Sequence, residues 1–269
     1  MGSRRAFKTS ENSEVASFSK YAEEILLCQE LIVGRSSARP IEIEVYHTSS
    51  THPDPFTHCS KLQKEFGKWY FHKIGNSYRG GSFKGLDITI GGNGTFGAIL
   101  LRSIKTDDGR VINGPSLIVD YLIESAGYES ISELDRAIAG RSVNDPSSPL
   151  HLTQSRTRNA KIYSSPRVGL TLKKISRKEK PQDFIMKGYR FLTEPKSVKK
   201  GRPYTIIGLL RNGYTTEEIK HLTGSPIGKI NEIYQLLQKP AELDDFFGIS
   251  LGTKELCGLH SAILGPLDI

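Results

Sequence analysis

Apolar residues follow two different spacings in the first part of the chain. Residues 11–32 place apolar side chains at helical intervals, which predicts an entry helix. Residues 41–46 alternate strictly between apolar and polar side chains, which predicts a half-buried strand. Its polar side carries Glu42, Glu44 and Tyr46. Turn sequences rich in glycine separate three further apolar segments, so strands are also expected at residues 69–74, 83–90 and 96–104.

Two helices are expected after these strands, because each has a recognisable start. Pro115 fits the first turn of a helix of about ten residues. Ser130 and Glu133 form a capping box for a second, short helix. Strands are expected again near residues 167–172 and 184–192. This order of elements predicts an α+β fold with a mostly antiparallel sheet and flanking helices.

The pattern changes near Gly201, where short helical segments replace the strands. A break at Asn212-Gly213 and a turn before Pro226 separate three such segments, which is typical of a helix-turn-helix-like element. A plain helical cap on the main domain is the alternative. We therefore predict two domains, one at residues 1–202 and one at residues 203–269. If this element is a helix-turn-helix, its recognition helix is expected to begin with Ser225, Gly228 and Lys229.

The composition is that of a folded protein in a reducing compartment. The chain has 269 residues, of which 37% are hydrophobic and 25% are charged. Its three cysteines lie far apart, so neither a disulfide framework nor a thiolate zinc site is expected. No apolar run is long enough to cross a bilayer. We expect a cytoplasmic monomer with no membrane partner, no cofactor and no resident metal.

Positive charge is concentrated in one window of the sequence. The net charge is +8, and residues 155–202 carry 15 basic and three acidic residues, which leaves the remainder at −4. A solvated surface is the alternative explanation, but such a concentration favours a polyanion, because each neutralised phosphate releases counterions. Nucleic acid is therefore the first partner to consider, and double-stranded DNA is the form that the family resemblance given below implies. The lysines expected to contact it are Lys173, Lys174, Lys199, Lys200 and Lys229.

Side chains suited to holding a planar ring cluster in residues 42–78. An imidazole, His58, follows the polar face of the strand at residues 41–46, and a run of aromatic residues begins at Trp69. Aromatic rings can hold a planar ring between them while a carboxylate acts as a general base beside it. An enzyme that acts on an extruded nucleobase needs this combination. A strand face that simply meets water is the alternative.

These motifs resemble those of the alkyladenine DNA glycosylases, whose hallmark strand E-x-E-A-Y is followed by D-x-x-x-H. Here residues 42–46 read E-I-E-V-Y and residues 54–58 read D-P-F-T-H, with a slightly longer spacer. The resemblance continues in order over roughly residues 20–200. Its further segments are residues 85–88, residues 99–102 with Arg102 at the end, Gly114-Pro115-Ser116 and Arg167-Val168-Gly169.

The resemblance assigns roles to individual residues. Glu44 matches the glutamate that activates water for attack on the sugar, Tyr46 and His58 match side chains that contact the flipped base, and Arg102 matches a contact to the DNA backbone. Glycosidic cleavage passes through an oxocarbenium-like state, which a nearby carboxylate stabilises. Because no lysine occupies a matching nucleophile position, a monofunctional glycosylase that leaves an abasic site is expected.

Departures from the family pattern bear on the substrate. Asp87 stands where the family has an asparagine on the pocket floor, and His72 stands at about the position of one of the family's pocket tyrosines. An ionised aspartate only accepts hydrogen bonds, which suits an exocyclic amine such as N4 of cytosine. With extra glycines nearby, a bulky or glucosylated cytosine in phage DNA is expected, in an antiviral role. Alkylated purines remain the alternative, and Asp87 as a solvent-facing turn residue is the simpler structural interpretation.

Three further interpretations concern neighbouring residues. Tyr78 and Phe83 are candidates for the wedge that fills the space left by an extruded nucleotide. A metal-dependent hydrolase is one rival, since His47, His52, His58, Cys59 and His72 lie close in the sequence, although their spacing matches no zinc pattern. A DNA-binding regulator without catalysis is another rival. The glycines of residues 91–94 lack the rest of a nucleotide-binding loop, so a hairpin turn is expected there.

Overall fold

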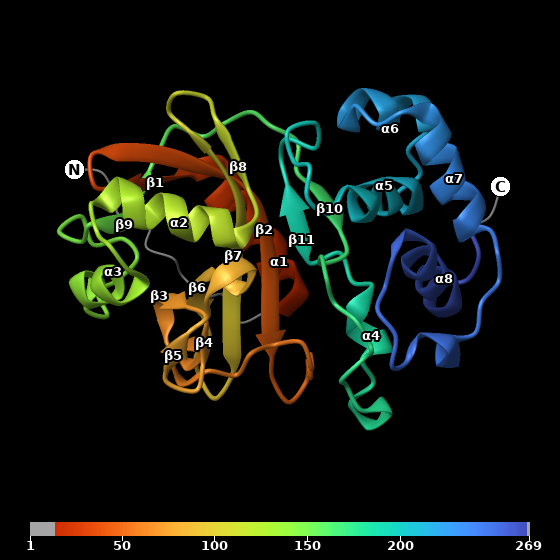
Figure 1. Cartoon of the computed structure of the whole chain (residues 1–269), viewed down its shortest axis with the longest axis horizontal. Helices are drawn as coiled ribbons and strands as arrows, with labels where there is room; N and C mark the ends of the chain where they lie inside the picture. Colours follow the sequence, from red (N-terminus) through yellow and green to blue (C-terminus); the bar gives the residue numbers. More distant parts are fainter. Residues whose placement is uncertain (1–13, 268–269) are drawn as a thin grey trace. The chain divides into compact units, whose positions relative to one another are not determined.

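The computed structural model describes residues 14–267, which form two compact units (Figure 1). Unit 1 comprises residues 14–52 and 59–160 of the described chain, and unit 2 comprises residues 53–58 and 161–267. The boundary thus lies before the one expected at residue 202, because α5 (Arg202–Arg211) packs on β10 (Tyr163–Ser165), which precedes it. Gly208 of α5 allows this close approach, since a Cβ there would lie 2.7 Å from Ser165 Cβ.

The first helix is shorter than the apolar spacing predicts. Helix α1 covers Glu14–Glu23, a π-helical turn follows at Glu24–Cys28, and Gln29–Val33 form strand β1. The helix expected over residues 11–32 is therefore wrong beyond Cys28, and its residues 11–13 lie outside the described part of the chain. Strand β1 alternates buried and half-buried side chains while pairing with β2 and β9 on its two sides. Sheet pairing thus decides the conformation of a segment whose local pattern also suits a helix.

Unit 1 contains an antiparallel sheet, which confirms the expected α+β class. Strands β2 (Ser36–Thr48), β7 (Phe96–Thr106), β6 (Leu86–Ile90) and β3 (Phe66–Phe71) lie side by side in that order. Strand β1 lies between β2 and β9 (Leu150–Gln154), and β8 (Val111–Asn113) pairs with β7. The expected strands are present with shifted ends: the segments predicted from residues 69 and 83 begin instead at Phe66 and Leu86.

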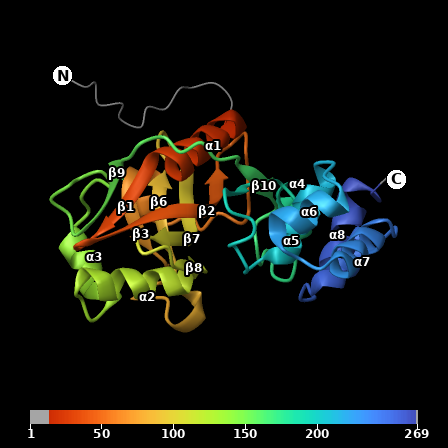
Figure 2. The same ribbon diagram turned by 90° about the horizontal axis from the view of Figure 1, so that it is seen from above.

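Helices cover both faces of this sheet. Figure 2 shows α1 on one side and α2 (Pro115–Ala126) on the other. As a result Glu42 and Glu44 are 1% and 0% exposed, so the prediction of a half-buried strand is wrong. Helix α2 begins at Pro115 as expected, and Ser130 caps α3 (Ile131–Ile138) by accepting a hydrogen bond from the backbone N–H of Glu133.

Short elements on one edge of unit 1 connect these strands. A 3-10 turn, η2, covers Lys61–Lys64, and β4 (Lys73–Ile74) pairs with β5 (Ser77–Tyr78) in a small hairpin. The 3-10 turn η3 (Gly81–Phe83) then leads into β6. Residues 91–94 form the expected tight turn between β6 and β7, where the N–H of Thr95 donates to the carbonyl of Gly92.

Unit 2 is mainly helical. Its strands β10 and β11 (Arg190–Leu192) pair antiparallel, whereas residues 167–172 form no strand and residues 184–189 include the end of the short helix α4 (Gln182–Ile185). Both strand predictions are therefore wrong over most of their length. The helical segments expected after Gly201 are present, as α5, α6 (Thr216–Thr223) and α7 (Ile227–Leu237). The remaining elements are η4 (Arg177–Glu179), η5 (Leu243–Phe246) and α8 (Thr253–Leu264).

A single apolar core joins the helices of unit 2. Helix α5 packs against both α6 and α7, and α7 also packs against α8. Thr215 caps α6 through a reciprocal pair of hydrogen bonds with Glu218. The core side chains at the centre of this bundle are Ile206, Leu209, Ile219, Ile230, Ile233 and Leu259.

Candidate active site

An irregular register between β2 and β7 brings four polar side chains of unit 1 together. The pairing shifts between Pro40 and Glu42 and again between Glu42 and Ile43. Such β-bulges bend the strand and redirect side chains. Glu42 now lies opposite Ser103, while Glu44 lies opposite Leu100, and Arg102 falls at the irregular step between them. The bulge therefore places one arginine within reach of both glutamates.

Glu44 is the centre of this buried cluster. Its Oε2 accepts a hydrogen bond from the Tyr46 hydroxyl at 2.8 Å and an ion-pair contact from Arg102 Nη1 at 3.2 Å. Arg102 Nε donates to Glu42 Oε1 at 3.1 Å, and the Ser103 hydroxyl donates to Glu42 Oε2. The carboxylate of Glu44 is thus fixed in position by a phenol and a guanidinium.

Arg102 forms ion pairs inside this cluster and is not available on the protein surface. Burial alone would lower the pKa of Arg102, but the negative charges of Glu44 and Glu42 outweigh this effect and raise the pKa above its usual value. The side chain is 8% exposed, and both of its bonded nitrogens point to carboxylates. The expected contact of Arg102 with the DNA backbone is therefore corrected to an internal role, holding Glu42 and Glu44.

Asp87, which the family resemblance places in the base pocket, lies in the same cross-strand row as Glu44. Glu44 on β2 pairs with Leu100 on β7, Leu100 pairs with Asp87 on β6, and Asp87 pairs with Tyr70 on β3. Directly paired residues of neighbouring strands point to the same face of a sheet. Glu44 and Asp87 therefore share one face, two strand spacings or about 10 Å apart.

The half-buried His72 pairs with the buried Asp87 beside this row. Nε2 of His72 lies 2.9 Å from Oδ1 of Asp87, and the Gln63 amide donates to Asp87 Oδ2 at 3.2 Å. Burial lowers the pKa of His72, but the charge of Asp87 outweighs it, so the pKa of His72 is raised. Gly85 leaves room for the imidazole, since a Cβ there would lie 2.6 Å from its ring. Asp87 is 3% exposed, so it is not a solvent-facing turn residue.

A second buried ion pair lies in unit 2, and it joins two of the motifs that carry the family resemblance. Arg167 contacts both oxygens of Asp54, at 2.6 and 3.2 Å, and both side chains are fully buried. The rings of Phe56 and Tyr189 lie 5.6 and 5.4 Å from the guanidinium carbon. This pair anchors the segment of residues 53–58 in unit 2. His58, at the end of that segment, is exposed and belongs to a different unit from Glu44 and Tyr46.

The two candidate wedge residues differ in their surroundings. The Tyr78 hydroxyl donates to Asp135 at 2.6 Å, and Lys73 Nζ lies 4.4 Å from the centre of its ring. Phe83 is 70% exposed on η3, and this turn is held by the Ser116 hydroxyl, which donates to the carbonyl of Gly81. The Tyr78 side chain thus makes contacts within unit 1, whereas the Phe83 ring is exposed to solvent. Of the two wedge candidates, only Phe83 presents a large apolar ring on the surface.

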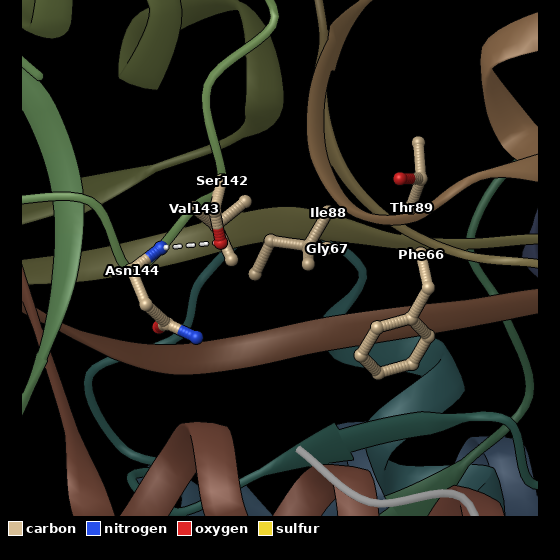
Figure 3. A pocket seen from close by; sticks show the side chains of 7 residues that line it. All are labelled: Phe66, Gly67, Ile88, Thr89, Ser142, Val143 and Asn144. Atoms are coloured by element: carbon tan, nitrogen blue, oxygen red, sulfur yellow. Dashed lines mark hydrogen bonds between the residues drawn. The ribbon is translucent and has the colours of Figure 1, made fainter. Parts of the chain in front are cut away.

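A cavity opens at the edge of the sheet next to the Asp87 row. It has a volume of about 170 Å³ and lies where the pairing of β3 and β6 is irregular between Phe66 and Trp69. Figure 3 shows the side chains around it; the lining residues are Phe66, Gly67, Ile88, Thr89, Ser142, Val143 and Asn144. Ile88 and Thr89 directly follow Asp87, so the cavity adjoins this part of the sheet.

The histidines proposed for a rival metal site are distributed among other contacts. The rings of His47 and His52 lie 5.9 Å apart, and each has the ring of Phe18 as an edge-on neighbour. His72 is bound to Asp87, and within residues 14–267 no three His, Cys, Asp or Glu side chains converge as metal ligands would. No helix in that same range is sufficiently long and apolar to traverse a membrane.

All five lysines that were expected to contact DNA lie on the surface of unit 2. Lys173, Lys174, Lys199 and Lys200 are exposed, and Lys229 on α7 is also exposed but forms an ion pair with Glu232 at 2.8 Å. The basic window itself crosses the boundary between the units, since residues 155–160 belong to unit 1.

The chain was compared with known proteins. No protein-family model matches the chain. A protein of Acanthamoeba polyphaga mimivirus, "Uncharacterized protein L759", is 33% identical over an alignment of 189 residues that covers 63% of this chain and 82% of the viral protein. The chain belongs to the family of mimivirus L759. Because the name L759 carries no activity, the chemistry of this family has to be argued from the side chains described above.

Several residues of the site were not singled out from the sequence. Gln63 and Ser103 complete the hydrogen bonding of Asp87 and Glu42, and the Asp54–Arg167 pair joins residues 113 positions apart. The resemblance did mark Asp54 and Arg167, as the first residues of two separate motifs. For Gln63 and Ser103 the sequence offers no comparable signal.

Proposed function

We propose that the chain is a monofunctional DNA glycosylase that flips a modified base into unit 1 and hydrolyses its N-glycosidic bond. The observation that carries this proposal is the Glu44 carboxylate, held by Tyr46 and Arg102 on the sheet face that also carries Asp87. One side chain can act on the sugar while another contacts the base. This row supports a proposal in which Glu44 on β2 carries out the reaction and Asp87 on β6 recognises the base.

In the proposed reaction, the oxygen of a water molecule attacks C1′ of the flipped nucleotide. The glycosidic bond breaks, its electron pair leaves with the base, and Glu44 accepts the proton of the attacking water. Arg102 keeps the carboxylate oriented, and the Tyr46 ring contacts the base in the proposed complex. Because Glu44 is fully buried in the free protein, the reaction requires the Tyr46 side chain to move when DNA binds.

The Asp87–His72 pair favours a cytosine-derived base. Asp87 accepts hydrogen bonds from Gln63 and from the imidazole, and an ionised carboxylate can also accept from an exocyclic amine. The exposed turn of Phe83 offers a ring to fill the gap in the duplex. We propose a bulky or glucosylated hydroxymethylcytosine in phage DNA as substrate, which places a monomeric enzyme in the cytoplasm in an antiviral role.

The test compares the wild-type chain with Glu44→Gln, which keeps the shape of the side chain and removes the general base. Duplexes carrying glucosylated hydroxymethylcytosine, unmodified cytosine or an alkylated purine are incubated with each protein. Released bases are identified by mass spectrometry, and abasic sites are counted by strand cleavage in alkali. The variant is expected to lose about 10²–10⁴ in rate while it still binds DNA.

The control variant is Glu30→Gln, at a carboxylate on β1 that accepts from Ser37 and lies outside the cluster. It should retain base release. Release of alkylated purines alone contradicts the cytosine assignment, and equal base release by the wild type and Glu44→Gln refutes the catalytic role of this residue.

A DNA-binding regulator is the second candidate function. The packing of α5, α6 and α7 in unit 2 favours it, because these helices follow the order and turn lengths of a helix-turn-helix. A regulator predicts that wild type and Glu44→Gln bind DNA equally and that neither releases a base from any duplex. The mass-spectrometric assay therefore separates the two functions directly.

A further inference from the structure

Helices α6 and α7 are joined as in DNA-reading helix pairs. Helix α6 has eight residues, a three-residue turn follows, and α7 has eleven residues. The turn begins with Gly224 at φ +69°, a left-handed conformation that glycine adopts without strain. Ile219 on α6 and Ile230 and Ile233 on α7 are fully buried. This packing fixes which side of α7 faces away from unit 2.

The outward side of α7 carries amide side chains. Asn231 and Gln235 are exposed and lie four positions apart, so they are neighbours on one face of the helix. Within residues 14–267, no hydrogen bond or ion pair engages either amide. Asn and Gln side chains can pair with the N6 and N7 positions of adenine in the major groove. An α-helix fits into that groove, so both amides can reach base edges.

A hollow lined by basic side chains lies beside the start of α7. Its volume is about 480 Å³, and it is lined by Lys196, Glu217, Lys220, His221, Gly224, Ser225 and Pro226. Arg202 supports the hollow from inside by donating to the carbonyl oxygens of Lys196 and Thr223. Burial, and then the positive charge of Arg190, lowers the pKa of Arg202, as expected where positive charge is concentrated.

The charge of this region suits a polyanion. Residues 196–239 contain eight Lys or Arg and three Asp or Glu. One of the acidic residues, Glu217, lies 3.9 Å from Lys220 at the hollow. No carboxylate of residues 14–267 forms an ion pair with Lys196, which also lines the hollow. Phosphate contacts of this kind orient a protein on a duplex, whereas contacts to base edges give sequence preference.

We propose that α7 reads the sequence of double-stranded DNA in the major groove through Asn231 and Gln235, with a backbone phosphate in the hollow at Lys196 and Lys220. This inference extends the proposed function, because it adds sequence-selective binding by unit 2 to base removal by unit 1. The enzyme would then act on modified bases near preferred sequences.

The test uses the full chain carrying Glu44→Gln, so that binding is measured without base removal. A random duplex library is selected for binding, and the enriched duplex is compared with a scrambled one by fluorescence anisotropy over a range of salt concentrations. We expect a short enriched motif that contains A·T pairs. The double variant Asn231→Ala/Gln235→Ala should lose about tenfold or more of the preference for that motif while binding the scrambled duplex unchanged.

The double variant Lys196→Ala/Lys220→Ala should bind both duplexes more weakly and lower the slope of log affinity against log salt by about two. Lys254→Ala, at an exposed lysine of α8, and Asn159→Ala, at an exposed amide of unit 1, are the matched controls and should change neither quantity. The proposal is overturned by a selection without enrichment, or by a motif preference that survives loss of both amides.

Failure of this proposal and failure of the glycosylase activity remain distinguishable. A motif preference without base release by the wild type supports the role of α7 and refutes the enzyme. Base release without a motif preference supports the enzyme and refutes the role of α7.

Discussion

His260 is a buried histidine whose two ring nitrogens have no hydrogen-bond partner in the described chain. It lies on α8 and is 1% exposed. Burial, and then the positive charge of Arg211, lowers the pKa of His260 to about 3. The folded protein therefore keeps this ring neutral under conditions in which the unfolded chain protonates it. We expect His260 to make the stability of unit 2 depend on pH.

The size of this effect follows from the two pKa values. Above the unfolded pKa of about 6.5 both states are neutral, so His260 contributes no pH dependence there. As the pH falls from 6.5 toward 3, only the unfolded chain binds the proton, and the free energy of unfolding decreases. At pH 5 the decrease relative to pH 8 is about 2 kcal/mol.

Replacing His260 with leucine tests this reasoning. His260→Leu should remove this 2 kcal/mol loss and also raise the free energy of unfolding at pH 8 by about 1–3 kcal/mol, because two unsatisfied nitrogens leave the core. The assay is urea unfolding followed by far-UV circular dichroism. The control is His221→Leu, at an exposed position of α6, which should leave the pH dependence unchanged. Equal pH dependence in wild type and His260→Leu would refute the argument.

Three further predictions concern other contacts. Arg167→Met leaves Asp54 buried without its charged partner and should lower the free energy of unfolding by about 3–5 kcal/mol in urea titrations; a change below about 1 kcal/mol would mean that the pair is hydrated in solution. Asp87→Asn removes the charge that raises the pKa of His72, so an NMR titration of its ring should show a lower pKa, and an unchanged value would contradict the assignment. Gly208→Ala places a Cβ 2.7 Å from Ser165 Cβ and should destabilise unit 2 by about 1–3 kcal/mol, with a lower melting temperature than the open-space control Gly228→Ala.

The alternating pattern of residues 41–46 predicted a strand with Glu42, Glu44 and Tyr46 on one face, and Glu44 and Tyr46 do contact each other. The pattern could not show that this face is buried. Polar side chains within a strand normally indicate exposure. Here Glu42 and Glu44 can be buried because Arg102 on β7 pairs with both carboxylates and Ser103 on β7 donates a hydrogen bond to Glu42. These contacts depend on the bulge between β2 and β7, and the spacing of apolar residues in the sequence does not indicate a bulge.

The helical segments after Gly201 were predicted well because their signals are local. A capping box at Thr215 and a glycine at residue 224 mark the ends of α6 whatever the rest of the chain does. Strand β1 and residues 167–172 were predicted poorly because their conformation depends on distant partners. Strand β1 is fixed by pairing with β2 and β9, and Arg167 is fixed by its ion pair with Asp54.

The cross-strand row from Glu44 to Asp87 has a consequence for how this fold can diversify. Glu44 and Arg102 are set by the β2–β7 bulge, whereas Asp87 and its partners Gln63 and His72 lie on β6 and the segments beside it. Under the proposed function, substitutions on β6 would therefore alter which base is bound without disturbing the Glu44 carboxylate on β2. If members of the L759 family share the proposed function, we expect their substrate differences to lie in β6 and the segments beside it. The β2–β7 bulge with Glu42, Glu44 and Arg102 should then be the same in all of them.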